Sequence, residues 1–155
     1  MIDWFVAWFL KGSLLWLALS VLVAVAMALD PMLTVYRTAH LHMALLGFVT
    51  QMIYGVALHV VPRFFGHPLV HRRLAEWQFW LAQAGLALMV TGFVARINGA
   101  VSAAAWTLGI GGTLSAAAAL AFVLGLWRTM NASPMYRKQP PPRKQPTVLP
   151  QEDAH

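Results

Sequence analysis

Two histidines, His40 and His42, lie inside a stretch of the chain that is otherwise strongly apolar. A side chain that can carry a charge is costly to place in a bilayer, and such residues commonly mark functional sites. A neutral imidazole is also a frequent axial ligand of haem iron. We therefore expect His40 to be an iron ligand, with His42 and His59 as secondary candidates for a metal.

Small residues line the helical face that carries His40. Residues about 3.6 positions apart share a face of an α-helix, so this face continues through Ala44, Gly47 and Gln51. Ala44 and Gly47 would leave room for a flat porphyrin, and they would equally let a second helix approach closely. Two interpretations stay open: an iron ligand beside a porphyrin, or plain helix packing in which His40 bonds a neighbouring carbonyl.

The other histidines are expected to play lesser roles. His42 is rotated from His40 by roughly 200° about the helix axis, so the two rings cannot ligate one metal from a regular helix. We expect His42 to make a polar contact near the membrane surface or to contact a haem propionate. His59 should lie near the opposite surface, as an interfacial side chain. His67 and His71 are expected to be interfacial cations or phosphate contacts.

The predicted spans contain no second axial ligand opposite His40. A six-coordinate haem needs two axial ligands, commonly two histidines or a histidine and a methionine. Met89 would lie too deep in its span to face His40 across one iron. The haem is then either five-coordinate or shares its second ligand with another chain, in a homo-oligomer or with other membrane subunits. Arg37 is expected to pair with a propionate, because its planar guanidinium donates two bonds to a carboxylate.

The composition places these residues in an integral membrane protein. Of 155 residues, 59% are hydrophobic and 10% are charged, and the mean hydropathy is +0.63, whereas about a quarter of the residues in a soluble domain are charged. Without cysteine, the chain forms no disulfide, thiolate nucleophile or iron–sulfur cluster of its own. The net charge of +6 is concentrated in loops and the C-terminal segment. We therefore expect a lipid bilayer, not nucleic acid, as the partner.

Apolar runs predict four membrane-spanning helices, because one span needs roughly 20 mostly apolar residues. The runs cover residues 4–29, 33–61, 74–95 and 100–127 within a domain of residues 1–131. The first run resembles a secretion signal, but we expect it to be retained, because its apolar part before Lys11 is long. Residues 132–155 are basic and rich in proline, which predicts a disordered tail. The expected fold is an all-α, integral membrane four-helix bundle with that tail.

The basic residues predict the orientation of the spans. Nine lysines and arginines lie on the side shared by the N-terminus, the middle loop and the tail, whereas Arg37 and Arg96 lie on the other side. The positive-inside rule then puts both termini in the cytoplasm of a multi-pass protein of the inner (cytoplasmic) membrane. His40 would lie within about two helical turns of the outer surface.

A family resemblance covers roughly residues 33–68. It rests on Thr38-Ala39-His40, Gly47-Phe48, Gly55 and Val61-Pro62-Arg63-Phe64. These residues resemble the second transmembrane helix of subunit I in the haem–copper oxidase superfamily, which includes cytochrome oxidases and nitric oxide reductases. The haem proteins of the NnrS type have a similar stretch.

The resemblance implies that His40 is an axial ligand of a low-spin haem near the outer surface. The helices that carry the remaining haem and copper ligands of that superfamily have no counterpart in four spans. The chain by itself is therefore not expected to reduce oxygen or nitric oxide, although it could form a subunit of an oxidoreductase. The expected cofactor is haem b, and copper stays open as an alternative metal.

Three functions are compatible with the sequence. The first is a membrane b-type haem subunit that acts in electron transfer or diatomic gas binding, as part of an oligomer or a larger complex. The second is a non-catalytic accessory or assembly subunit of a respiratory or photosynthetic membrane complex. The third is a quinone-binding subunit in which His40, Gln51 and Tyr54 contact the head group.

Overall fold

The computed structural model describes residues 2–66 and 68–132, and all secondary structure within these residues is helical. The all-α class is therefore confirmed. The predicted disordered tail lies outside the described residues, apart from Ala132. The elements, in chain order, are α1 (Trp4–Leu29), the 3₁₀-helix η1 (Pro31–Tyr36), α2 (Arg37–His42), the π-helix η2 (Met43–Thr50), α3 (Gln51–Phe64), α4 (Arg72–Ile97) and α5 (Val101–Met130).

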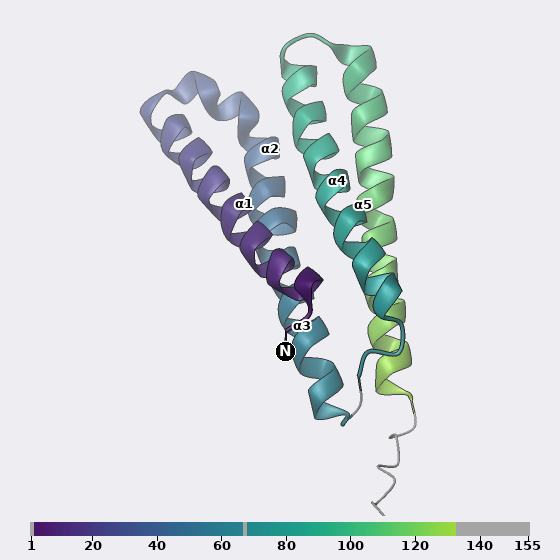
Figure 1. The fold of residues 1–155 in the computed structure, drawn as a ribbon. Helices are drawn as coiled ribbons and strands as arrows, with labels where there is room; N and C mark the ends of the chain where they lie inside the picture. The colour runs from purple at the N-terminus through teal and green to yellow at the C-terminus, as the bar shows by residue number, and fades with distance from the viewer. Residues whose placement is uncertain (1, 67, 133–155) are drawn as a thin grey trace, which may run out of the picture.

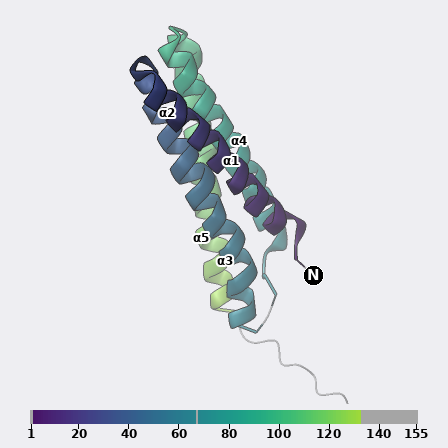
Figure 2. The same ribbon diagram turned by 90° about the vertical axis from the view of Figure 1, so that its left-hand side faces the viewer.

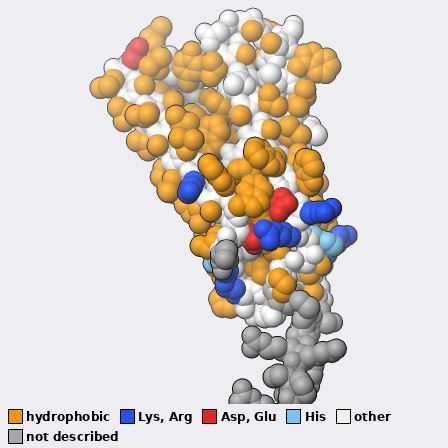
Figure 3. Space-filling view, viewed as in Figure 1, with side chains coloured by type: hydrophobic (Ala, Val, Ile, Leu, Met, Phe, Trp, Pro, Cys, Tyr) orange, Lys and Arg blue, Asp and Glu red, His pale blue; other side chains and the backbone are white. Residues whose placement is uncertain are grey.

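Four helical segments are long and apolar enough to cross a membrane. They are Trp4–Leu29, Pro31–Phe64, Arg72–Ile97 and Val101–Met130, and η1, α2, η2 and α3 together make the second of them. They form two antiparallel hairpins that lie side by side, α1 with the second span and α4 with α5 (Figures 1 and 2). Large apolar side chains cover much of the outer surface (Figure 3). This exposure suits contact with lipid chains.

Local sequence signals explain where the helices end. Asp30 ends α1, and its side chain accepts a hydrogen bond from the Met32 N–H at 2.9 Å, which starts η1. Gly99 has a φ of +84° in the turn between α4 and α5, a conformation that glycine adopts without steric cost. The predicted run 33–61 ends just before Pro62, whereas α3 continues through this proline to Phe64. A proline removes only one backbone donor, and here it lies in the last helical turn.

The α4–α5 hairpin is joined by close backbone contact. A Cβ placed on Gly111 would lie 2.8 Å from the Gly85 carbonyl oxygen and 2.8 Å from the Met89 backbone nitrogen. A Cβ on Gly85 would lie 2.7 Å from the Ser115 backbone nitrogen. Small residues allow membrane helices to pack this tightly. The glycines therefore set the spacing of α4 and α5.

An aromatic cluster joins the two hairpins in the half of the molecule that contains the N-terminus. Phe9 makes edge-to-face contacts with Tyr54 on α3 and Phe79 on α4, with ring centroids 5.7 and 5.1 Å apart. Tyr54 also packs on Phe122 of α5, at 4.5 Å. Aromatic pairs of this geometry add about 0.5–1.5 kcal/mol to the effect of burial.

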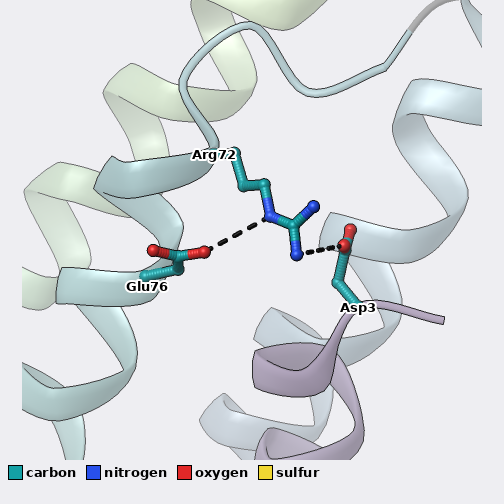
Figure 4. A network of polar contacts seen from close by, with 3 residues as sticks. All are labelled: Asp3, Arg72 and Glu76. Carbon is teal, nitrogen blue, oxygen red and sulfur yellow. Dashed lines mark hydrogen bonds and ion pairs between the residues drawn. The ribbon is translucent and has the colours of Figure 1, made fainter.

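An ionic contact lies near the same end of the molecule. Arg72 lies between two carboxylates, 3.1 Å from Asp3 and 3.3 Å from Glu76 (Figure 4). The contact links the start of α1 to the start of α4. Because all three groups are partly exposed, we assign it an orienting role and little stability.

Candidate functional site

The ring of His40 is held by α1. Its Nδ1 lies 3.0 Å from the Ser20 main-chain oxygen and 3.1 Å from the Ser20 hydroxyl. Because a carbonyl oxygen only accepts, Nδ1 must carry the proton and donate it to this oxygen. The lone pair of the neutral ring is then at Nε2. Metal-ligating histidines commonly have this arrangement, in which a hydrogen bond to one ring nitrogen sets the tautomer for ligation by the other.

This geometry is compatible with both interpretations of His40, the iron ligand and the helix-packing residue. The ring does bond a neighbouring carbonyl, as helix packing requires, and the same bond leaves Nε2 suited to a metal. No hydrogen bond joins Nε2 to another of the described residues. His40 is half-buried where α2 meets α1.

The space beside Gly47 is filled by protein. A Cβ placed on Gly47 would lie 2.6 Å from Cβ of Trp16 and 3.0 Å from a methyl carbon of Leu86. Close packing against α1 and α4 therefore accounts for the glycine, and the porphyrin space expected at Gly47 is occupied by these two side chains. The sequence did not show this, because the partner of a small-residue face depends on tertiary packing. Ala44 is half-buried one turn closer to His40.

His42 contacts a different helix from His40. Its Nδ1 lies 2.8 Å from the Thr38 main-chain oxygen, and its ring centroid lies 4.6 Å from that of Phe93 on α4. The polar contact expected for His42 is thus made with its own helix. Since the two rings contact α4 and α1 respectively, the structure does not bring them to one metal.

The remaining predicted residues lie apart from His40. His59 lies near the other end of the second span and lines a pocket of about 370 Å³ together with Asp3 and Arg63. Arg37 is exposed and forms no ion pair with the described residues. His71 lies 3.5 Å from an Arg128 nitrogen. His67 lies outside the described residues, within which no cluster of three histidine, cysteine or acidic side chains could hold a metal.

An apolar groove of about 410 Å³ lies between α1, the second span and α4. Ala39 and Met43, which flank His40 in the second span, form part of it, and Tyr36, Trp16 and Val90 contribute further walls. Its volume is in the range of pockets that bind small molecules. Sequence reasoning missed this groove, because its walls come from three helices.

A buried amide network joins the two hairpins. Gln83 donates to Gln51 Oε1 at 2.7 Å, and Trp16 Nε1 donates to Gln83 Oε1 at 3.1 Å. Gln51 is 1% exposed. Buried polar pairs of this kind hold membrane helices together. Gln51 bonds Gln83 and not a group near His40. This network therefore does not bring together the residues that the quinone interpretation requires.

Breaking the amide pair should destabilise the protein. We expect Gln51→Leu to lower the free energy of unfolding by about 1–3 kcal/mol, since it leaves Gln83 Nε2 without its acceptor, while Gln83 Oε1 keeps the bond from Trp16. The double variant Gln51→Leu/Gln83→Leu should lose less than the sum of the two single variants. Unfolding in mixed micelles of a denaturing detergent measures both effects.

Gln78 is the matched control for this pair. It is also 1% exposed, but its Nε2 has no hydrogen-bond partner among the described residues. Gln78→Leu should therefore be neutral or stabilising. Equal losses for Gln51→Leu and Gln78→Leu would contradict a specific amide pair.

No protein-family model and no curated protein matches the chain. The fold and the composition define a multi-pass α-helical membrane protein.

Proposed function

We propose that this protein is a membrane haem-binding subunit in which His40 is an axial ligand of the iron. The proposal depends on one observation, the 3.0 Å contact from His40 Nδ1 to the Ser20 carbonyl oxygen. That bond sets the tautomer in which Nε2 has a lone pair to offer, and it restrains the ring.

The described residues fit a haem b group in part. His40 would supply one axial donor, and exposed Arg37, which has no ion-pair partner among the described residues, suits a propionate. The apolar groove formed in part by Ala39 and Met43 has walls that suit a porphyrin edge, but His40 is not among the residues that line it. Gly47 does not contribute, because Trp16 covers it. Haem would supply one-electron transfer or diatomic gas binding.

The proposed haem site would need a second axial ligand from another chain, or it would remain five-coordinate. The sequence predicts no second axial ligand opposite His40 within the four spans, so a second copy of the chain or another membrane subunit would supply it, or the iron would keep an open position. Two ligands would favour electron transfer, and an open position would favour gas binding. We place the protein in the inner membrane with both termini in the cytoplasm, from the nine-to-two distribution of basic residues.

An absorption spectrum tests the function. Protein expressed with ample haem and purified in mild detergent should show a Soret band that shifts on reduction. Carbon monoxide added to the reduced form should shift the band again if a coordination position is open. Absence of a Soret band from a folded, haem-supplied preparation would contradict the proposal.

A second candidate is a non-catalytic accessory or assembly subunit of a respiratory or photosynthetic complex. It is favoured by the packing of Trp16 against Gly47, which makes this face a helix interface. In that case His40 would serve as a bond between α2 and α1. Co-purification with a larger membrane complex, with no haem in the isolated chain, would support it.

A further inference from the structure

A small void, about half open to the surface, lies where the second span meets the α4–α5 hairpin. Its volume is about 20 Å³, and it is lined by side chains of η2, α3, α4 and α5: Leu46, Thr50, Tyr54, Ala82, Leu86, Ser115 and Ala118. Three of these side chains carry hydroxyl groups. A void of roughly 10–15 Å³ on this measure holds one water molecule when polar groups line it.

Two of the hydroxyls have no protein partner. Neither Thr50 Oγ1 nor Tyr54 Oη forms a hydrogen bond with another described residue, and the Ser115 hydroxyl reaches only the Met89 sulfur, at 3.6 Å. A thioether sulfur is a weak acceptor. Hydroxyl groups inside a membrane domain lack the bulk water that would otherwise satisfy them.

Thr50 differs from five of the six other threonines in the described helices, whereas Thr38, like Thr50, forms no side-chain hydrogen bond with the described residues. The hydroxyls of Thr34, Thr91, Thr107, Thr113 and Thr129 each donate to a carbonyl three or four residues earlier. Thr50 makes no such bond, although its helix is continuous. It is the last residue of the π-helix η2, whose wider turn changes the position of the preceding carbonyls. The Thr50 side chain lines the void instead.

We propose that one water molecule binds in this void and bridges Thr50, Tyr54 and Ser115. A water there can accept from two hydroxyls and donate to others, which matches the two to four partners that buried waters have. The bridge joins the π-helical part of the second span to α5. It thereby links the two hairpins beside the Gln51–Gln83 pair. This inference does not depend on the haem proposal.

A structure of the purified protein at about 2 Å resolution tests the site directly. We expect density for one water with its oxygen about 2.6–3.0 Å from Thr50 Oγ1 and from Tyr54 Oη. A void without density, or a Thr50 hydroxyl that donates to its own helix, would overturn the inference.

A double-mutant cycle gives a second test that does not need a crystal. Thr50→Val and Tyr54→Phe each remove one hydroxyl with little change in shape, and each should lower the unfolding midpoint in mixed micelles. Because either change releases the same water, the double variant should lose less than the sum of the two. Thr113→Val is the control, since its hydroxyl bonds the Gly109 carbonyl at 2.8 Å, and it should add fully to Tyr54→Phe. Full additivity of Thr50→Val with Tyr54→Phe would overturn the bridge.

Discussion

Replacing Gly111 by valine should destabilise the protein by about 1–3 kcal/mol or prevent folding, because the added side chain meets backbone. A Cβ at this position would lie 2.8 Å from both the Gly85 carbonyl oxygen and the Met89 nitrogen. Neither atom can rotate away as a side chain would. The α4 and α5 helices would have to separate, and the contacts along their length would weaken. The free energy of unfolding in mixed micelles measures the loss.

Gly112 is the control next to it. No atom lies within 4 Å of a Cβ placed on Gly112, and the same holds for Gly109. Gly112→Val should therefore leave the unfolding free energy nearly unchanged, since the substitution meets open space on the same helix. If both valine variants lost the same stability, helix propensity would explain the effect and the proposed close approach at Gly111 would be wrong.

Removing the imidazole of His40 should abolish haem absorption if His40 is the axial ligand. In His40→Ala we expect the Soret band to disappear from the purified protein, while the helical circular dichroism persists. Loss of the Ser20 bond should by itself cost about 0.5–1.5 kcal/mol of stability, which leaves a folded protein to measure. Added imidazole should restore part of the band, because it replaces the missing ligand.

His42 supplies the comparison for this experiment. It lies two positions from His40, and its Nδ1 also bonds a main-chain oxygen, that of Thr38. Its ring packs on Phe93 of the other hairpin, so His42→Ala should keep the Soret band and the redox shift. A Soret band that survives His40→Ala and disappears in His42→Ala would show that His42, and not His40, is the axial ligand.

Much of the architecture follows from the chain itself. The apolar runs and the low charge predicted an all-α membrane protein with four long helices, and the second span observed, Pro31–Phe64, contains the predicted run 33–61. Long apolar stretches determine helices because every backbone group in lipid must bond within its own segment. The helical period also showed that His40 and His42 face different neighbours, which the contacts with Ser20 and Phe93 confirm.

Other features could not be predicted from the sequence, because they depend on how the helices pack. The period placed Ala44 and Gly47 on the face of His40, but it could not show that Trp16 covers Gly47. The π-helix Met43–Thr50 was likewise not visible in a run of ordinary apolar residues.

The tertiary structure alone decided which polar groups meet. Gln51 and Gln83 are 32 positions apart and bond each other, whereas Gln78 has an equally buried amide without a described partner for its nitrogen. Ser20 contacts His40 because α1 and α2 run antiparallel on either side of the turn at Asp30, in a register that places these two residues side by side. Helix periodicity specifies the face on which a residue lies, and the register between helices specifies what that residue contacts.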